Sequence, residues 1–335
     1  MPRARDISVR AGRCTGCARI ISYGADTTSP RQEDQGHGMG MFGTVRRDWD
    51  WSRRPLGAQG LRGRTIAVVG GTGGIGRAIV NEAVSKGAEA WVVGRTFRDR
   101  PDPRVHFVQA DLSSLRRARA VVAELPVPTF DVVVMTQGIF AGRQRKVNED
   151  GIELDMAISH LSRSVMVREM APAIGSGRPA GAPAPRIFVM GFPGGTRAAE
   201  VENFNAERPF VWEQAHANTV VGNEALVLDG AERYPHVRFY GLNPGIMKSN
   251  IMGGLLGEGS PFHVAQQTVI GLIFQSVEQY AAKIVPLLFA PEIDGRSGAM
   301  FDRNANPIFS NPYLTDRAYR TRVTEASEAL LARVR

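Results

Sequence analysis

Short apolar runs alternate with longer amphipathic stretches along most of this chain, beginning near residue 65. A short apolar run between turn residues is typical of a strand that is buried on both faces, and the longer stretches have helical spacing. The predicted strands are 66–69, the run ending at Val93, 105–109, 130–135, 186–190, 237–242 and 299–301. One helix is predicted to begin near residue 75, and the others to span about 113–124, 150–174, 208–233, 262–282 and 315–333.

This alternation predicts an α/β fold: a single Rossmann-type, doubly wound parallel sheet with helices on both faces, joined by right-handed crossovers. We assign residues 63–312 to this domain and 313–335 to a C-terminal helix. Residues 41–62, which include Trp49 and Trp51, are predicted to be a strap that packs onto the domain.

Residues 1–40 are rich in Arg, Gly, Ser and Asp and show no periodicity. A segment of this kind buries too little apolar surface to fold, so we predict a disordered N-terminal arm. Met39 and Met41 are predicted as alternative translation starts. Cys14 and Cys17 form a Cys-x-x-Cys pair, but a structural zinc site needs four ligands and only His37 lies nearby, so no metal site is predicted.

A glycine cluster follows the first strand and precedes the first helix, within Val69-Gly70-Gly71-Thr72-Gly73-Gly74-Ile75-Gly76. Glycine allows tight turns and a close approach of the backbone to a ligand, and the free N–H groups of a helix N-terminus attract phosphate. This strand–loop–helix context predicts a dinucleotide site. The predicted contacts in the loop are Gly70, Thr72, Gly73, Gly74, Ile75 and Gly76.

The end of the second strand distinguishes the two nicotinamide cofactors. A carboxylate there would bind the ribose 2′-hydroxyl of NAD, but this strand ends Val93-Gly94-Arg95. An arginine can instead pair with a 2′-phosphate. We therefore predict that the cofactor is NADP(H), and NAD is the less favoured alternative. An Arg95 that is exposed to solvent and binds no phosphate is the other alternative.

Composition and charge indicate which classes of partner the chain is expected to bind. The apolar fraction is 43% and the net charge is +8, but residues 1–62 hold eleven arginines against six acidic residues. The remainder is near +3, so nucleic-acid binding is not predicted. No apolar stretch is long enough for a membrane helix, and no secretory signal is seen. We predict a cytoplasmic protein that does not bind membranes.

The chain resembles the short-chain dehydrogenase/reductase family over roughly residues 63–310, and its retinol-dehydrogenase-like branch in particular. The motifs that carry the resemblance are the glycine loop, with Val69 in place of a Thr, Asp111-Leu112, Pro244-Gly245 with Ser249, Asp150-Gly151-Ile152-Glu153 and Ala157-Ile158-Ser159-His160-Leu161. The resemblance implies further cofactor contacts at Asp111, Leu112, Gly138, Pro244, Gly245 and Ser249. It also implies a homodimer or homotetramer through the helices near 150–174 and 208–233.

The family's catalytic residues are replaced. Aligned on Pro244-Gly245, its Tyr falls at His216 and its Lys at Val220. Its Ser falls at Phe192 and its Asn at Ser159. No tyrosine in the chain is followed four residues later by lysine.

His216 is the candidate proton-transfer residue, because an imidazole titrates near neutral pH, and Ser159 is a second candidate. A histidine that only fills space is the alternative. Glu213, three residues before His216, is a possible partner, with a solvated carboxylate favoured. His160 is predicted to be buried against the sheet. An apolar pocket under a flap at 246–262 is predicted from Phe192, Phe210, Trp212, Met247 and Met252, although core packing explains them equally well.

Three functions follow. The first is an atypical NADP(H)-dependent oxidoreductase of a small lipophilic alcohol or ketone, in which His216 replaces the Tyr. The second is a redox-neutral enzyme on the same scaffold, catalysing cyclisation, dehydration or isomerisation. The third is a non-catalytic NADP(H)-binding protein, because a fold does not grant an activity.

Overall fold

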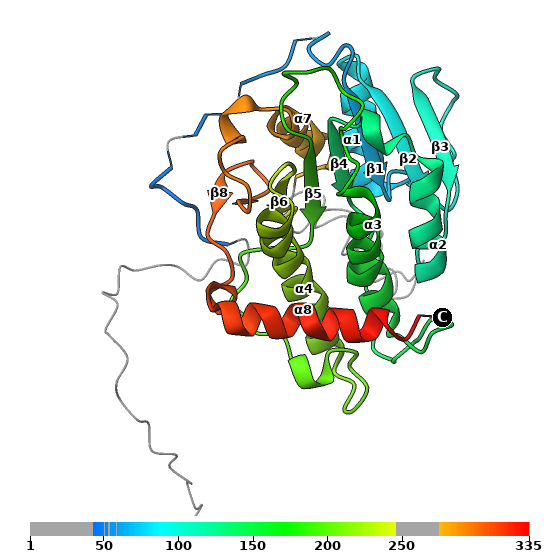
Figure 1. Ribbon diagram of the computed structural model, residues 1–335, viewed down its shortest axis with the longest axis vertical. Helices are drawn as coiled ribbons and strands as arrows, with labels where there is room; N and C mark the ends of the chain where they lie inside the picture. The colour runs from blue at the N-terminus through cyan, green and yellow to red at the C-terminus, as the bar shows by residue number, and fades with distance from the viewer. Residues whose placement is uncertain (1–42, 50, 53, 58, 246–274, 335) are drawn as a thin grey trace, which may run out of the picture. The chain divides into compact units, whose positions relative to one another are not determined.

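The computed structural model describes residues 43–49, 51–52, 54–57, 59–245 and 275–334. Within these ranges the chain forms an eight-stranded sheet in the order β3-β2-β1-β4-β5-β6-β7-β8 (Figure 1). The strands are β1 (Thr65–Val69), β2 (Glu89–Gly94), β3 (Val105–Gln109), β4 (Val132–Met135), β5 (Arg186–Met190), β6 (Arg238–Leu242), β7 (Met300–Phe301) and β8 (Pro307–Ile308). The first seven pair in parallel, which confirms the predicted Rossmann-type α/β fold.

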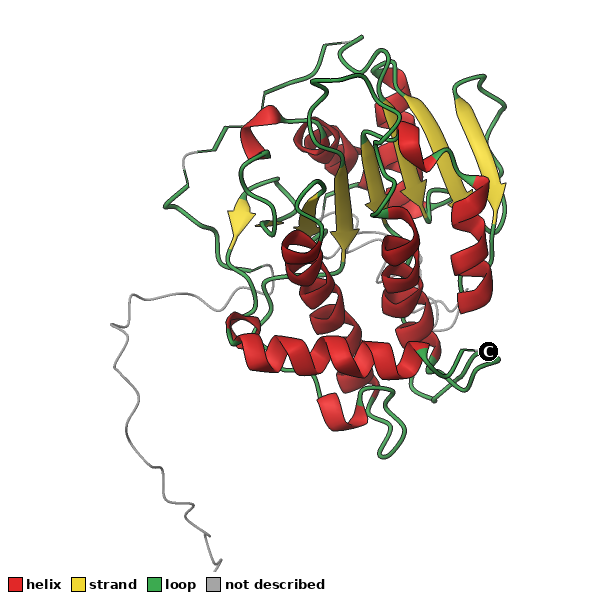
Figure 2. Ribbon diagram, viewed as in Figure 1, coloured by secondary structure: helices red, strands yellow, loops and turns green. Residues whose placement is uncertain are grey.

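Helices cover both faces of the sheet (Figure 2). One face carries α1 (Gly74–Ser85) and α7 (Val277–Leu288), which pack against each other. The other carries α2 (Leu115–Ala120), α3 (Ser162–Met170) and α4 (Trp212–Arg233), with α8 (Arg317–Leu331) lying across α4 (Figure 1). Each face has its own apolar core, because the buried strands present apolar side chains on both sides.

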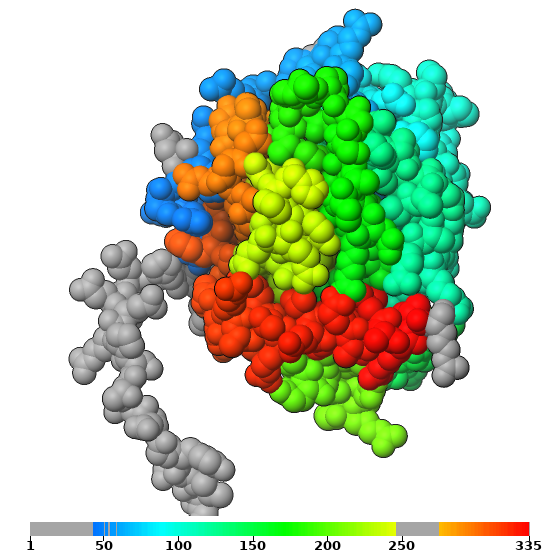
Figure 3. All heavy atoms as spheres, in the orientation of Figure 1, coloured from blue at the N-terminus to red at the C-terminus, as the bar shows by residue number. Residues whose placement is uncertain are grey.

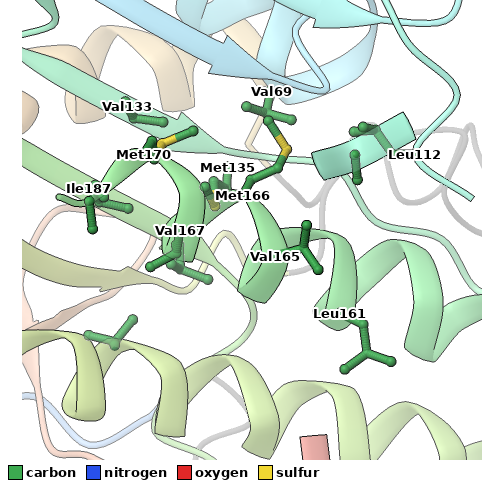
Figure 4. Close-up of a cluster of buried hydrophobic side chains, with 14 of the residues drawn as sticks. Val69, Leu112, Val133, Met135, Leu161, Val165, Met166, Val167, Met170 and Ile187 are labelled. Atoms are coloured by element: carbon green, nitrogen blue, oxygen red, sulfur yellow. The ribbon is translucent and has the colours of Figure 1, made fainter. Parts of the chain in front are cut away.

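The core beneath α3 shows how the strands meet the helix (Figure 4). Val133 and Met135 point from β4 toward Met166 and Met170 of α3, and all four are fully buried. In the sequence, β4 is an apolar run and α3 carries apolar residues along one face. Their contact holds α3 against β4.

The structure has one strand that was not predicted, and two of the predicted helices have clearly different bounds. β8 was not predicted, and it pairs with β7 antiparallel. The long helix predicted from 150 begins later, because residues 147 and 153 form a β-bridge and its first regular part is a π-helix, Met156–Leu161. The predicted end near 282 is wrong as well, since α7 continues to Leu288 through Pro286.

The segment assigned as a strap contacts the sheet edge. Val45 bridges to Ile308 of β8, and the rings of Trp49 and Phe301 lie 5.7 Å apart. Trp51 Nε1 donates to the carbonyl of Ala305 at 2.6 Å. These contacts close an edge that would otherwise expose unpaired backbone groups. The predictions for 1–40, Cys14, Cys17 and the 246–262 flap lie outside the described residues.

Helix α8 lies over the face formed by α3 and α4 (Figure 3). His160 Nε2 lies 2.8 Å from Ser327 Oγ of α8, and Arg168 of α3 forms an ion pair with Glu328. His160 is buried as predicted, but against α4 and α8 instead of the sheet. None of the helices described here is both long enough and apolar enough to span a membrane.

Candidate active site

The glycine loop lies at the carboxyl end of β1 and opens α1. Gly70 and Gly74 have φ angles of +82° and +50°, which side-chain-bearing residues rarely adopt. A Cβ on Gly76 would stand 2.5 Å from the Gly70 carbonyl oxygen, so only glycine lets the helix begin this close to the strand. Cβ atoms built on Gly73 and Gly74 meet no atom within 4 Å. The loop therefore offers open backbone to a ligand.

The N-terminus of α1 suits an anion. Its N-cap, Gly73, provides no side-chain hydrogen bond, and the first turn holds no acidic residue. The N–H groups of the first turn and the helix dipole are thus available to a phosphate. These features fit the pyrophosphate of a nicotinamide dinucleotide, whose binding residues here would be Gly73, Gly74 and Ile75.

Thr72 connects this loop to the end of β2. A Cβ on Gly94 would stand 2.6 Å from Thr72 Oγ1, so the threonine lies against the backbone just before Arg95. The Arg95 side chain is exposed, and its backbone carbonyl accepts a hydrogen bond from Gln109 Nε2 at 3.0 Å. Arg95 thus follows the strand end that Thr72 contacts, and its side chain is open to solvent.

The ends of β3, β4 and β6 reach the same edge of the sheet. Asp111 Oδ1 accepts hydrogen bonds from Ser113 N and Ser113 Oγ at 3.0 and 2.8 Å, which starts the turn into α2 and buries Leu112. After β6, Gly245 N donates to Asn243 Oδ1 at 2.9 Å, and Pro244 is buried. Ser249 lies outside the described residues.

The turn after β4 rests on the π-helix. Ile139 N donates to Ser159 Oγ at 3.0 Å, and a Cβ on Gly138 would lie 3.4 Å from the same oxygen. Ser159 is 5% exposed. Its hydroxyl therefore supports the turn from behind, so these contacts favour a positioning role over contact with a substrate. π-Bulges of this kind are frequent at functional sites.

His216 lies near the start of α4, beside this turn. Its Nδ1 is 2.8 Å from Oδ2 of Asp155, which lies one turn before Ser159. The Asp155 side chain is 4% exposed and the His216 side chain 23%. The Phe140 ring, two residues past Gly138, lies 4.1 Å from the imidazole, centroid to centroid.

This geometry identifies a partner that sequence reasoning missed. The candidate Glu213 is exposed, and its carbonyl accepts a hydrogen bond from Arg197. Asp155 lies 61 positions before His216 in the chain, so no helical spacing relates the two. A carboxylate acceptor fixes the Nδ1–H tautomer and leaves Nε2 free to exchange a proton.

Phe192 occupies the position after β5 where a serine was expected. Its φ is +54°, a conformation that is strained for an aromatic residue. A phenylalanine has no hydroxyl, so Phe192 itself cannot act as the donor that the resemblance places at this position. Phe210 and Trp212 are half-buried, and Met247 and Met252 lie outside the described residues. The apolar pocket therefore stays a prediction.

Two buried carboxyls flank these elements. Burial raises the pKa of Glu224 to about 7, although its oxygens accept hydrogen bonds from the backbone N–H groups of Gly194 and Asn311. Burial also raises the pKa of Glu153 to about 7, with the nearby charge of Asp155 contributing. Both groups hold a proton at a pH where ordinary glutamates have lost it.

Comparison with known proteins agrees with the geometry. The short chain dehydrogenase family model matches residues 64–182. "Uncharacterized oxidoreductase YKL107W" of Saccharomyces cerevisiae is 36% identical over 269 residues, covering 79% of this chain and 87% of that protein. "Retinol dehydrogenase 14" of Homo sapiens is 24% identical, covering 72% and 78%.

Solved structures share the fold. The short-chain dehydrogenase/reductase from Serratia marcescens superposes with a TM-score of 0.52 at 20% identity, covering 72% of this chain and 96% of that one. An NADH-dependent reductase complexed with NAD also superposes with a TM-score of 0.52, at 17% identity, covering 73% and 96%. At these identities the likeness concerns the fold alone.

Proposed function

Because the chain belongs to the short-chain dehydrogenase/reductase family, we propose that it is an NADP(H)-dependent oxidoreductase of a small lipophilic alcohol or ketone, with His216 as the proton-transfer residue. The family implies a nicotinamide cofactor, and its relatives are named as oxidoreductases. The choice of NADP(H) is supported by Arg95. The observation that carries the proposal is the 2.8 Å contact between His216 Nδ1 and Asp155 Oδ2.

His216 and Asp155 together can transfer the proton that the family's tyrosine transfers. In carbonyl reduction, an imidazolium donates the Nε2 proton to the substrate oxygen as the hydride reaches the carbonyl carbon. In alcohol oxidation, neutral Nε2 takes up the hydroxyl proton. Asp155 keeps Nδ1–H directed toward itself in both directions and stabilises the imidazolium. The nicotinamide, when bound, supplies or accepts the hydride.

The surroundings support a proton-transfer role over space filling. The carboxylate of Asp155 is buried, and a buried carboxylate needs a donor to offset its desolvation. The ring of His216 is also held from the side by Phe140. An imidazole fixed by two contacts is pre-oriented, which is what general acid–base catalysis requires.

A panel of lipophilic ketones incubated with NADPH tests this function. We expect loss of absorbance at the nicotinamide band with at least one ketone, faster with NADPH than with NADH. Product formed without any change in that band would favour the redox-neutral alternative. Tight NADPH binding without any product would favour the binding-only alternative.

A homo-oligomer remains part of the proposal. Because α8 packs over α3 and α4, a dimer that uses this face must be built on the outer side of α8. Native mass spectrometry of the full chain, compared with a chain that ends at residue 312, measures this. A dimer that persists without α8 would show that α8 itself does not form the interface.

A further inference from the structure

The turn that follows β4 is fastened by two side chains that lie next to each other. Ser159 Oγ accepts a hydrogen bond from Ile139 N at 3.0 Å, and Arg163 Nη2 donates to the carbonyl oxygen of Gln137. A Cβ on Gly138 would lie 3.4 Å from Ser159 Oγ and 3.5 Å from Arg163 Nη2, so both polar groups lie beside this glycine. The two bonds therefore hold the backbone immediately before and immediately after Gly138.

Arg163, in α3, is an unusual residue for a buried position. It is 2% exposed, and burial lowers its pKa to about 9, so it is still a cation at neutral pH. Its Nε and Nη1 have no hydrogen-bond partner among the described residues, so its bond to Gln137 is the only one it forms with them. Burial of a charge is costly, and a methionine would fill similar space without that cost. The charge-assisted bond to Gln137 is what distinguishes an arginine here.

The same turn also lies against the glycine loop. A Cβ on Gly70 would stand 2.6 Å from Gln137 N, and Thr136 N and Thr136 Oγ1 both donate to the carbonyl of Val69 at 2.8 Å. The strand order reverses between β1 and β4, and a dinucleotide binds across the crevice at such a point. The turn therefore lies at this crevice, on the side away from β2 and Arg95.

The bond from Arg163 fixes the direction of one backbone donor. The peptide between Gln137 and Gly138 is trans, so its C=O and N–H groups point in opposite directions. Because Arg163 binds the carbonyl, the N–H of Gly138 points away from the guanidinium. That N–H has no hydrogen-bond partner among the described residues, and Gly138 is only half-buried. An oriented but unpaired donor at the crevice suits an acceptor oxygen of a ligand.

We propose that Arg163 is a positioning residue for the nicotinamide cofactor: its bond to Gln137 directs the N–H of Gly138 to an oxygen in the nicotinamide half of the dinucleotide. The nicotinamide half is the one concerned, because the adenosine half belongs beside β1 and β2. Gly138 was expected as a contact from the resemblance, but Arg163 was not. The inference rests on the proposed function only in requiring a nicotinamide dinucleotide.

Nucleotide binding to the full chain, measured by isothermal titration calorimetry, tests this role without any turnover. We expect Arg163→Met to weaken NADPH and NADH by about 10-fold each, because the affected contact lies away from the 2′-phosphate. Adenosine 2′,5′-bisphosphate has only the adenosine half, so its affinity should change by less than about 2-fold. Unchanged affinity for NADPH and NADH, or an equal loss for the bisphosphate, would overturn the proposal.

Two further variants test whether the effect comes from the turn. Arg168→Met is the matched control, because Arg168 belongs to the same helix but pairs with Glu328 of α8, and all three affinities should stay unchanged. Ser159→Ala removes the other bond to the turn. Because both bonds hold the same backbone, the losses of NADPH affinity from Ser159→Ala and Arg163→Met should not add in the double variant. Additive losses would contradict a shared role.

The amide signal of Gly138 reports on the donor itself. Glycine-selective ¹⁵N spectra of the full chain resolve such amides, and the Gly138 signal is assigned by its absence in Gly138→Ala. We expect NADPH to displace this signal in the wild type and to displace it less in Arg163→Met. A wild-type Gly138 signal that NADPH leaves in place would overturn the proposal, even if the Arg163 variant fails to fold.

These readouts separate the inference from the proposed function. If nucleotide affinity and the Gly138 signal depend on Arg163 but no substrate turns over, the function fails and the positioning role stands. If an alcohol or ketone turns over but neither readout responds to Arg163, the positioning role fails and the function stands. A wild-type protein that binds neither nucleotide would overturn both.

Discussion

The two halves of the sheet edge carry different kinds of chemistry. The cofactor half, β1 to β2, keeps the family's glycine loop, and the work there is done by backbone N–H groups and helix geometry. The other half, β4 to α4, has His216 and Val220 at the positions where the resemblance aligns the family's Tyr and Lys, and it holds His216 against Asp155. In our proposal, the fold thus keeps its means of binding a dinucleotide while His216 replaces the proton-transfer group.

The two halves differ in whether a position can accept another residue type. At Gly76 a Cβ would meet backbone atoms, so no other residue type fits without moving α1. In the proposed mechanism, position 216 needs only a proton donor at one point in space, which a different side chain with a different partner can provide. Variants in each half should therefore change different properties: turnover near His216 and cofactor affinity near the glycine loop.

The largest effect is expected from His216→Phe. The change removes the proton-transfer group and retains a ring against Phe140, so kcat should fall by about 10²-fold or more, while NADPH affinity stays unchanged. His106→Phe is the matched control, because His106 lies in β3 and stacks on Trp91. Full activity of His216→Phe would make the imidazole a space-filler.

Restoring the family pair is the companion experiment. His216→Tyr combined with Val220→Lys should recover carbonyl reduction relative to His216→Phe, because the site would again hold a phenol with a neighbouring ammonium. Steady-state rates with the same ketone measure this. No recovery would indicate that the site no longer presents a substrate oxygen at this point.

In the cofactor half, Arg95→Asp should erase or invert the preference for NADPH. The wild type is expected to bind NADPH in the micromolar range or tighter, and the substitution should change the ratio of the two affinities by about 10-fold or more. Arg100→Asp, an exposed arginine in the same loop, is the control. Equal wild-type affinity for NADPH and NADH would overturn the assignment of the cofactor.

The buried Glu224 makes stability depend on pH. Its folded-state pKa of about 7 exceeds the value of 4.5 expected when unfolded, so between these values the folded state retains a proton that the unfolded state loses. The contribution is present below about pH 4.5 and is lost as the pH rises through 7, by up to about 3 kcal/mol. Urea unfolding at pH 5 and pH 8 measures how much the free energy of unfolding changes between these pH values. Glu224→Gln should make this change smaller without abolishing it, because burial also raises the pKa of Glu153 to about 7. The same change in wild type and Glu224→Gln would show that Glu224 is not its source.

The smallest effect is expected at the N-terminus. Deleting residues 1–38 should leave the thermal midpoint and NADPH binding nearly unchanged. Deleting residues 1–52 also removes Trp49 and Trp51, whose contacts with Phe301 and Ala305 should be worth about 5 °C or more. Differential scanning calorimetry compares the two, and a large fall with the shorter deletion would show that the arm packs on the domain.

The sequence predicted features that depend on local patterns. Apolar runs located the seven parallel strands, and the glycine loop located the dinucleotide edge. β8 was missed because a two-residue strand that contains Pro307 has no periodicity to detect. The candidate histidine, His216, was found only through a resemblance. Its partner was missed because Asp155 and His216 meet through the packing of two helices, which no single-helix spacing encodes.

Deuterium at the reactive C4 position of labelled NADPH shows whether the protein transfers a hydride and whether His216 assists it. We expect the wild type to transfer the label to the carbonyl carbon of the product. His216→Phe should bind the same nucleotide equally well but transfer the label about 10²-fold more slowly or worse. Transfer at the wild-type rate by His216→Phe, or product that carries no label from the wild-type enzyme, would contradict it.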